Sequence, residues 1–454
     1  MGNRAALLLM VGILAASCIL VPLPVKAEPR TIVVPDDYAT IQGAINVAGE
    51  GDTVFVKKGN YNEQTLVIRK SISLIGEDPI NTRISLNPPW IVSPYEGIPF
   101  SNEPSRYDDP VKIEADNVRI SGLTITNNAS KNGLFLVLGE RNQITGNIIT
   151  IGIYLHGSYQ IVAQNTLTAI VDCSGFFNTI AGNEIVGGWI WIGIRETSEI
   201  PSYVTNVVYG NTLTNGDGLG IGGDGNIVFN NTVLSSYGLG VSSSASNNIL
   251  CANRVINCTR GIHSFASEGN NNTFYANFVA DNRYGATVMH YFSQVGNSTF
   301  YHNNFVNNDE QVNTDATVVL TGTGTYTAHH FGCFDNGVEG NYWSDYDGND
   351  ADGDGLGDTP FIIDSNRRDS YPLMAPFDIS SVTVELPSWA YQLPNPLPPP
   401  LPLPSIELQP PIPQLEPESL PTSPIAVVAS VAAVAVGAGL LLYQRKRRRE
   451  AART

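Results

Sequence analysis

The chain has 454 residues, of which 42% are hydrophobic and 15% are charged, and its formal net charge at pH 7 is −17. Between residues 28 and 424 it has 17 lysines and arginines against 41 aspartates and glutamates, a balance of about −24. This acidity excludes nucleic acid and anionic membrane surfaces as partners of that part of the chain, because like charges repel.

Residues 1–27 have the pattern of a secretory signal peptide. Arg4 precedes an apolar run that ends at Leu23, and short side chains occupy the −3 and −1 positions of a cleavage site after Ala27. An uncleaved membrane anchor is the alternative interpretation. Export places the later cysteines in an oxidising compartment, where disulfides and buried thiols are both open. These cysteines are Cys173, Cys251, Cys258 and Cys333.

Residues 28–116 predict a cap followed by the first coils of a solenoid. Short strands are expected at 31–34 and 51–56, and the apolar spacing between them predicts an amphipathic helix over 41–48. A helix over the first coil would cover its open apolar end and prevent edge-to-edge association.

Residues 117–315 contain a repeated six-residue template, usually bounded by asparagine. Its copies begin at Asn117, Asn142, Gln160, Asn178, Asn206, Asn226, Asn248, Asn272 and Ser298. The average step of about 23 residues is typical of one coil of a parallel β-helix, with three short strands and three turns. A leucine-rich repeat is disfavoured because its leucine skeleton is absent, and a propeller blade would need nearly twice this period.

The repeat also predicts how each coil is held. Alternation directs one apolar side chain of each pair inward, and stacking of the coils buries a continuous core. Asparagine at the turn after the first strand tolerates a left-handed backbone. Its amide can also bond the asparagines of the coils above and below, as in an amide ladder. We therefore predict an all-β solenoid with a short N-terminal capping helix.

Residues 316–378 are assigned to C-terminal coils that carry an Asp/Gly-rich loop. Carboxylates at positions 1, 3, 5 and 9 and a backbone carbonyl at position 7 match an EF-hand-like loop, whose oxygen ligands suit Ca²⁺. The candidate ligands are Asp350, Asp352, Asp354, Leu356 and Asp358. Position 12 is Phe361, so Asp364 or Asp345 would have to replace the usual bidentate acid. A bound ion would clip the end of the solenoid, and a glycine-rich turn without an ion is the alternative.

The C-terminal part predicts a stalk and a membrane anchor. Residues 379–424 are dense in proline, which favours extended polyproline II and does not pack a core. Residues 425–443 are apolar or small, and at about 1.5 Å per residue they just cross a hydrocarbon core of about 30 Å. The basic tail 444–454 stays in the cytoplasm, so the rest of the chain is outside the cell, anchored by a single pass.

Two groups of motifs flank the repeats. They lie at 34–45, 51–54, 59–61 and 70–76, and at 341–345, 352–358 and 371–373. Together they resemble the NosD-type proteins of the pectin-lyase-like superfamily, over about residues 31–376. The resemblance implies a right-handed β-helix outside the cytoplasm, in a domain type found in carbohydrate-binding and sugar-hydrolysing proteins. It also implies a possible role as a copper accessory protein. The C-terminal anchor resembles those of archaeal surface proteins.

The third strand of successive coils predicts a ligand-binding face. Aromatic side chains that point outward beside glycines at 218–222 and 238–240 could form a groove in which sugar rings stack. The candidate ligand residues are Tyr154, His156, Trp189, Trp191 and Arg195. His263 is expected on the same stripe. The alternative is that the tryptophans pack under the loop 196–205.

No catalytic residue is assigned, because β-helix hydrolases need paired carboxylates. The acidic residues of the repeats fall on different coils: Asp172, Glu184, Glu196, Asp217 and Asp224. The one cluster with the soft ligands that copper prefers is His329, His330 and Cys333. Sequons that favour glycosylation begin at Asn128, Asn230, Asn257, Asn271 and Asn297.

We therefore expect a membrane-anchored extracellular β-helix protein without catalytic activity. Its expected partners are polysaccharides or envelope glycans and neighbouring surface proteins, and its expected cofactor is at most Ca²⁺. A surface-tethered polysaccharide lyase or glycoside hydrolase is the first alternative, and a NosD-like copper accessory protein is the second.

Overall fold

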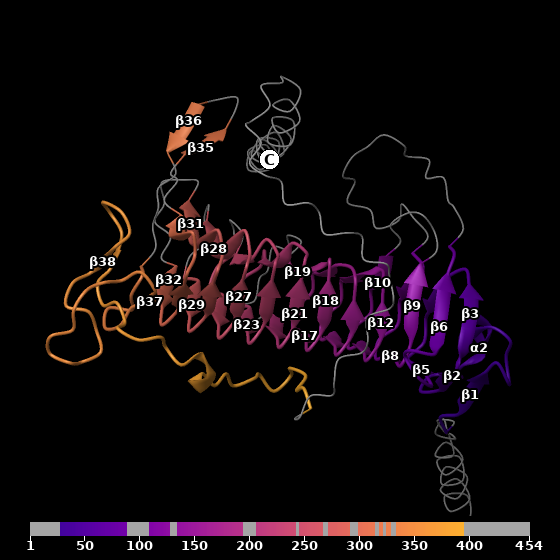
Figure 1. Ribbon diagram of the computed structural model, residues 1–454. Coiled ribbons are helices and arrows are strands. Elements are labelled where there is room, and N and C mark those ends of the chain that lie inside the picture. The colour runs from indigo at the N-terminus through magenta and orange to yellow at the C-terminus, as the bar shows by residue number, and fades with distance from the viewer. Residues whose placement is uncertain are drawn as a thin grey trace, which may run out of the picture.

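The computed structural model describes residues 28–88, 109–127, 134–193, 206–241, 245–266, 271–290, 298–313, 317–320, 324–327 and 333–394. Most of them form one rod of stacked coils (Figure 1). The predicted signal peptide, the membrane span at 425–443 and the basic tail lie outside these ranges. Within the ranges, no helix is long and apolar enough to cross a membrane.

Each coil contributes one strand to each of three parallel sheets. Sheet A contains β1 (Thr31–Val34), β2 (Thr53–Val56), β5 (Ser73–Gly76), β8 (Arg119–Ser121), β11 (Gln143–Thr145), β14 (Ile161–Ala163), β17 (Asn178–Ala181), β20 (Asn206–Tyr209), β23 (Ile227–Phe229), β26 (Ile249–Cys251), β29 (Thr273–Tyr275) and β32 (Thr299–Tyr301). Sheet B contains β3 (Gly59–Glu63), β6 (Thr82–Leu86), β9 (Thr124–Asn127), β12 (Ile148–Ile149), β15 (Thr166–Leu167), β18 (Glu184–Val186), β21 (Thr212–Thr214), β24 (Thr232–Leu234), β27 (Arg254–Ile256), β30 (Phe278–Ala280), β33 (Asn304–Val306) and β37 (Tyr342–Trp343). Sheet C contains β4 (Leu66–Ile68), β7 (Val111–Ile113), β10 (Leu134–Val137), β13 (Gly152–Leu155), β16 (Val171–Cys173), β19 (Trp189–Ile192), β22 (Gly218–Ile221), β25 (Leu239–Val241), β28 (Arg260–Ala266), β31 (Tyr284–His290) and β34 (Glu310–Asn313). The fold is a right-handed parallel β-helix, as expected.

The core of the rod is a set of inward columns, one from each sheet. Eight inward residues of sheet C are at most 1% exposed: Ile153, Leu155, Ile190, Ile192, Leu219, Ile221, Leu239 and Val241. Towards the C-terminal end the inward column of sheet B becomes aromatic. The rings of Phe305, Trp343 and Phe361 stack in sequence with centroids 4.5 Å apart at each step. These large rings fill the last coil and close that end of the core.

A buried amide ladder runs through the turn between sheets A and B. Its members are Asn147, Asn165, Asn183, Asn211, Asn231, Asn253, Asn277, Asn303 and Asn341. The Oδ1 atom of each member accepts a bond from the backbone N–H of the member before it, as between Asn183 and Asn211 at 3.0 Å. A second ladder precedes sheet A, from Asn142 and Gln160 onwards. The ladders agree with the repeat pattern and bond the backbone N–H groups of successive turns.

We expected the ladder asparagine to have the left-handed backbone at the turn between sheets A and B, and this expectation was wrong. The left-handed residue is the one just before the asparagine, with φ of 64° at Gly146, 62° at Gly182 and 53° at Ala252. The ladder asparagine has its amide directed into the rod, and the preceding residue makes the sharp reversal that allows this. The preference for asparagine therefore comes from the amide bonds and not from backbone tolerance.

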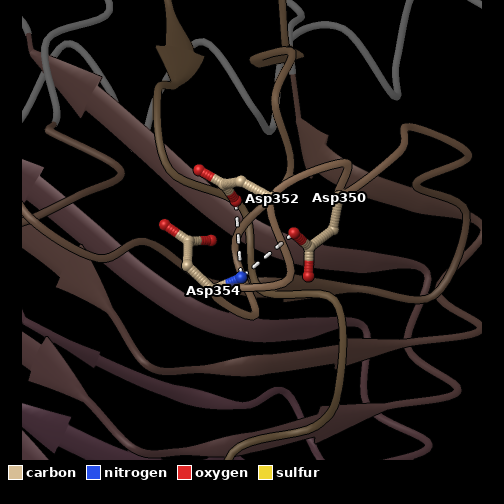
Figure 2. A group of neighbouring side chains, drawn as sticks. All are labelled: Asp350, Asp352 and Asp354. Carbon is tan, nitrogen blue, oxygen red and sulfur yellow. Dashed lines mark hydrogen bonds between the residues drawn. The ribbon is translucent and has the colours of Figure 1, made fainter.

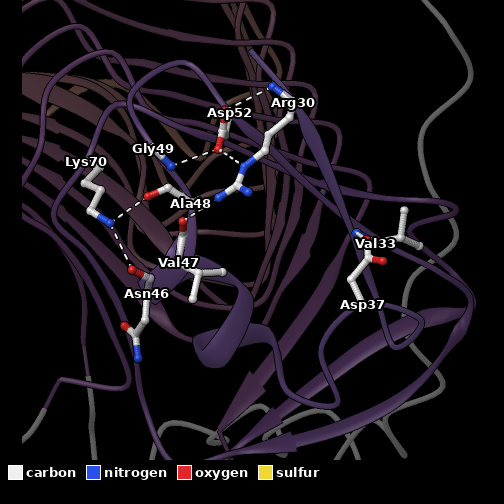
Figure 3. A network of polar contacts seen from close by, with 9 residues as sticks. All are labelled: Arg30, Val33, Asp37, Asn46, Val47, Ala48, Gly49, Asp52 and Lys70. Carbon is white, nitrogen blue, oxygen red and sulfur yellow. Dashed lines mark hydrogen bonds and ion pairs between the residues drawn. The ribbon is translucent and has the colours of Figure 1, made fainter. Parts of the chain in front are cut away.

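The N-terminal cap contains the predicted helix as α2 (Ile41–Val47), with Ile41, Ala44 and Ile45 buried against the first coil. Thr40 caps its start by accepting a bond from the Gly43 N–H at 3.1 Å. Two cations satisfy the carbonyls at its other end (Figure 3). They are Lys70, bonded to Asn46 and Ala48, and Arg30, bonded to Val47 and paired with Asp52. Positive charge at a helix C-terminus is stabilising, so the cap is fixed at both ends.

The region 316–378 adds one strand, β37, to the coils among the described residues. The rest of it forms two antiparallel hairpins and a loop. The hairpins are β35 (Thr317–Leu320) with β36 (Gly324–Thr327), and β38 (Phe361–Ile362) with β39 (Arg368–Asp369). A short 3₁₀ helix, η1 (Ile379–Ser381), follows. The C-terminal coils expected here are thus reduced to a single strand and a cap.

Residues 382–393, which we call the strap, lie along the outer face of sheet A (Figure 1). The middle of this outer face is apolar, like the inner face of the sheet. Val207, Tyr209 and Phe229 belong to a second apolar cluster there. Strap residues complete the cluster: Val382, Val384, Leu386, Trp389, Ala390, Tyr391 and Leu393. The described beginning of the predicted stalk therefore packs on the rod, and residues 395–424 lie outside the described ranges.

Candidate functional site

The outer face of sheet C places polar and aromatic side chains in one row. Tyr154 on β13, Asp172 on β16 and Trp191 on β19 occupy neighbouring register positions. Strands in a sheet lie about 4.8 Å apart, so the three side chains are adjacent along the rod axis. The row continues through Gly220 and Gly240. Sequence analysis placed Tyr154 and Trp191 on this face, and the structure brings them together on either side of a carboxylate.

The Trp191 indole lies on Gly220 of this row and on Gly222, two residues further along the chain. A Cβ atom at Gly220 would lie 2.6 Å from Trp191 Cε3, and one at Gly222 would lie 2.7 Å from Cζ2. The indole therefore lies flat over the two glycines, and larger residues would displace it. We expected a bare glycine floor beside the tryptophan, and the ring covers that floor instead. Trp191 is still 36% exposed, so the outer face of the ring is open to a ligand.

A second pair of side chains lies next to this row. His156 Nδ1 is 3.2 Å from Ser174 Oγ, and both side chains are half-buried. Trp189, two residues before Trp191 on the same strand, is also half-buried. Arg195 and the loop 196–205 lie outside the described residues, so neither the predicted arginine ligand nor the alternative of a covering loop is tested.

His263 is on the predicted stripe, but its position is structural. Its ring occupies the space above Gly240, where a Cβ would come within 2.2 Å of three ring atoms, and meets Tyr237 edge-on at 5.6 Å. Burial, together with the nearby Arg260 charge, lowers the pKa of His263 to about 3. The imidazole is therefore neutral and packs as a flat ring on the sheet.

Asp172 and Ser174 are the site residues that sequence reasoning missed. Asp172 was grouped with carboxylates scattered over different coils. A step of 18 residues from Tyr154, the same as that from Asn147 to Asn165, would have placed it in the row. Glu184 is on sheet B and so faces away from Asp172. Among the described residues of this face, the row therefore has one carboxylate and not a facing pair.

The Asp/Gly-rich loop brings three of its predicted ligands together (Figure 2). Candidate ligand oxygens of Asp350, Asp352 and Asp354 all lie within 4.8 Å of one another. Asp350 also accepts bonds from the backbone N–H groups of Gly353 at 2.7 Å and Gly355 at 2.9 Å. These bonds lower the pKa of Asp350, so the loop holds an ionised carboxylate at its first position.

The two acids that could replace position 12 are already engaged. Asp364 pairs with Arg367 at 2.7 Å, and Asp345 accepts a bond from Gln311 at 2.9 Å. Asp358 accepts a bond from the Ala351 N–H at 2.8 Å and lies outside the group of three. The loop thus offers three clustered carboxylates and lacks the bidentate acid, an arrangement that favours weak Ca²⁺ binding.

If Ca²⁺ binds this loop, its removal should loosen the C-terminal end of the rod. We predict that a chelator lowers the melting temperature by about 5 °C in a buffer with millimolar Ca²⁺, because an ion bound only by the folded state stabilises that state. Differential scanning fluorimetry measures the shift, and the Asp350→Ala/Asp352→Ala variant should show none. The same melting temperature with and without chelator would reject the site.

The predicted glycosylation sites are partly described. Asn230, Asn257 and Asn271 are exposed at turns and have left-handed backbone, with φ of 52°, 55° and 65°. Asn128 and Asn297 lie outside the described residues. The three described side chains face solvent, and their glycosylation stays a prediction.

The four cysteines after the signal are free thiols. Burial raises the pKa of Cys173 to about 12 and those of Cys251 and Cys258 to about 11, while Cys333 is exposed. Both outcomes were open from the sequence, and the structure has buried thiols in place of disulfides. Raised pKa values make the three buried thiols poor nucleophiles and poor metal ligands.

The sequence matches the family described as "Periplasmic copper-binding protein (NosD)" over residues 93–288 and 178–348. Together these matches span more than half of the chain. The chain belongs to the NosD family. The matched residues include the Tyr154–Asp172–Trp191 row, so the NosD repeats are the coils that build the candidate site.

Three solved structures are similar to this NosD-family chain in fold. The A-module of mannuronan C-5 epimerase AlgE6 from Azotobacter vinelandii is 13% identical, covers 60% of this chain and 90% of its own, and has a TM-score of 0.41. The catalytic domain of a GH87 α-1,3-glucanase is 10% identical, and the match covers 65% of this chain and 68% of the glucanase chain, with a TM-score of 0.41. The PL6 alginate lyase AlyGC is 14% identical, and the match covers 63% of this chain and 52% of the lyase chain, with a TM-score of 0.34. No curated protein matches the chain in sequence. At these identities and TM-scores we base no inference on the three structures.

Proposed function

We propose that this protein is a membrane-anchored extracellular β-helix that binds glycans on the outer face of sheet C without cleaving them. The observation that carries the proposal is the row of Tyr154, Asp172 and Trp191 on three adjacent strands. Aromatic faces pack against the apolar faces of sugar rings, and a carboxylate between them accepts bonds from sugar hydroxyls. Sites for small polar ligands commonly combine these two features.

The rigidity of the row supports the same proposal. The side chains stand on neighbouring strands of a solenoid, and the Trp191 ring is seated on Gly220 and Gly222. The side chains are therefore already ordered before a ligand binds, so that little conformational entropy is lost on binding. A repeating polymer suits a surface that itself repeats along the rod axis, so we propose a polysaccharide or envelope glycan as the ligand.

The proposal predicts that the tryptophans are needed for binding and not for folding. Replacement of Trp189 and Trp191 by alanine should weaken glycan binding at least tenfold, because each lost stacking contact costs about 1 kcal/mol or more. Affinity electrophoresis in polysaccharide-containing gels measures the loss. Tyr38→Ala, which removes a similarly exposed aromatic from the N-terminal cap, serves as the control and should bind normally. Undiminished binding by the double variant would discard the row as the site.

The second candidate is an enzyme that acts on a surface polysaccharide. The specific observation in its favour is that Asp172 lies beside Tyr154, with His156 and Ser174 on the adjoining register position. A carboxylate, a phenol and an imidazole on one face could exchange protons with a bound sugar. We rank it second because glycoside hydrolysis requires a second carboxylate, and the described part of the row has only Asp172.

The family description names copper, and the described residues contain no cluster of the side chains that copper prefers as ligands. Copper sites use thiolate, thioether and imidazole ligands. In the described ranges, the one group of three or more metal-binding side chains is the Asp350, Asp352 and Asp354 cluster, which offers hard oxygen ligands. The predicted pair His329 and His330 lies outside those ranges. We therefore derive no function through copper.

A further inference from the structure

The strap lies along the rod and ends far from the last coils. Five residues before the strap, the Asn304 side chain on β33 makes two bonds with the backbone of Phe377, at 2.7 and 2.8 Å. At its end, the Tyr209 hydroxyl bonds the Tyr391 carbonyl at 2.7 Å and the Leu393 N–H at 2.8 Å. The strap therefore runs back along the rod from the last coils to a coil far from that end.

The distance covered can be counted in strands. The chain runs from Phe377, beside the coil of β32 and β33, to Tyr391 at β17, where Thr179 Oγ1 accepts a bond from the Tyr391 N–H at 3.1 Å. Sheet A has five strand-to-strand steps between β32 and β17, which is about 24 Å at about 4.8 Å per step. Because β17 is the seventh of twelve strands in sheet A, the described part of the strap ends near the middle of the rod.

The surface of sheet A is shaped to hold the strap. Gly182 and Gly210 leave room for the Leu393 side chain, and a Cβ atom at Gly182 would lie 2.9 Å from Leu393 Cδ2. Trp389 meets Phe177 edge-on at 5.5 Å. Alternate strap residues face the sheet, because Val382, Val384 and Leu386 are half-buried while Thr383 and Glu385 are exposed. This alternation is that of a strand laid on an apolar surface.

We infer that the strap anchors the rod by its flank. The rod is then attached near the middle of its length and not at one of its ends. The inference rests on the proposed membrane anchoring for its biological meaning, and the docked strap itself does not depend on it. In Figure 1 the strap follows the lower side of the rod and the strands of sheet C lie along the upper side. The candidate glycan-binding row is thus on the side of the rod opposite to the strap, and a flank attachment leaves both ends of the rod accessible.

The native cysteines provide a test of strap docking in full-length protein reconstituted in liposomes. Cys251 belongs to the apolar cluster that the strap completes, while Cys333 is exposed and Cys173 faces the core. A maleimide reagent should label Cys333 at once and Cys251 slowly. Trp389→Ala/Leu393→Ala should raise the Cys251 rate at least tenfold, and Glu385→Gln, an exposed position on the same strap, should leave it unchanged.

Two further measurements keep the outcome clear. Tyr209→Phe removes only the hydroxyl that bonds the strap, so it should accelerate Cys251 labelling even if the double variant misfolds. Continued protection of Cys173 shows that the rod is intact. Fast labelling of Cys251 in the wild type, or unchanged rates in both strap variants, would overturn the inference. Flotation of the protein with the liposomes tests the anchor separately, so a protein that fails to float but protects Cys251 rejects the proposed anchoring alone.

The position of the end of the strap is measured by energy transfer within the liposome-bound protein. A donor at Gln392→Cys should be at similar distances from acceptors at Tyr38→Cys in the N-terminal cap and Val338→Cys in the C-terminal cap, in a Cys333→Ser background. Strap variants should make both distances broad and variable. A wild-type donor clearly nearer to the C-terminal cap would contradict a flank attachment.

Discussion

Replacing Asn211 by alanine should lower the free energy of unfolding by about 3–5 kcal/mol. The Asn211 amide donates to the Ile180 carbonyl at 2.9 Å and to Asn231 Oδ1 at 2.9 Å. Its own Oδ1 accepts from the Asn183 backbone and side chain at 3.0 and 2.9 Å. Alanine leaves these fully buried groups without partners, and each such group costs about 1–3 kcal/mol.

The measurement is urea unfolding followed by circular dichroism, together with hydrogen exchange. Exchange should rise first in β17 and β20, because a solenoid coil contacts only its neighbours and can open locally. Asn62→Ala is the control, since Asn62 is exposed on β3, and its effect should stay within about 0.5 kcal/mol. An Asn211→Ala protein as stable as this control would show that the ladder does not hold the coils.

Replacing Asp369 by alanine should have an effect of similar size, about 3–5 kcal/mol, at the C-terminal end. Asp369 is fully buried and terminates the ladder by accepting bonds from the Asn341 N–H at 2.7 Å and Trp343 Nε1 at 2.8 Å. It also accepts the Tyr371 N–H at 3.0 Å. Because each ladder member donates to the next, the last one needs an acceptor, and a carboxylate supplies two oxygens.

The pH dependence of the free energy of unfolding distinguishes the effect of the Asp369 charge from the effect of its size and shape. Burial raises the pKa of Asp369 to about 6, so the folded state favours its protonated form more than the unfolded state does. Its contribution to stability therefore increases as the pH falls from about 7 to about 4. Asp369→Asn lacks this titration, so the stability difference in favour of the wild type should widen over the same range. A difference that is constant with pH, measured by urea unfolding, would contradict the raised pKa.

The regular part of the fold could be predicted because it is local and periodic. Each template copy contains its own turn residues and its own inward apolar residue, so the coil at Ile190 and Ile192 obeys the same rule as the coil at Leu219 and Ile221. The amide ladder followed from the same repetition. Only the choice of left-handed residue was wrong, because the backbone geometry depends on where the asparagine amide points.

The strap could not be predicted because its contacts join residues about 200 positions apart, such as Tyr391 and Thr179. Proline density indicated a linker, and it gave no information about where its first residues lie. The signal that was present is the apolar outer face of sheet A. Val207 and Tyr209 have the parity of outward residues, and apolar side chains at that parity need a cover.

The candidate site was predicted in part for a similar reason. Tyr154 and Trp191 stood out as aromatics beside glycines, whereas Asp172 joins them only after the coils are aligned in register. The position of the indole over Gly220 and Gly222 depends on a side-chain rotamer, which a residue pattern does not specify. The three carboxylates of the Asp/Gly-rich loop were predicted, because that cluster lies within five consecutive residues.

The central claim, a glycan-binding row on sheet C, is tested most directly by one measurement. Full-length protein is incubated with a panel of neutral and acidic polysaccharides, with and without Ca²⁺, and retention and chain cleavage are scored separately. The account predicts retention of at least one polysaccharide without product, lost in the Trp189→Ala/Trp191→Ala variant and kept in Tyr38→Ala. Reproducible product formation, or no retention of any polysaccharide, would contradict it.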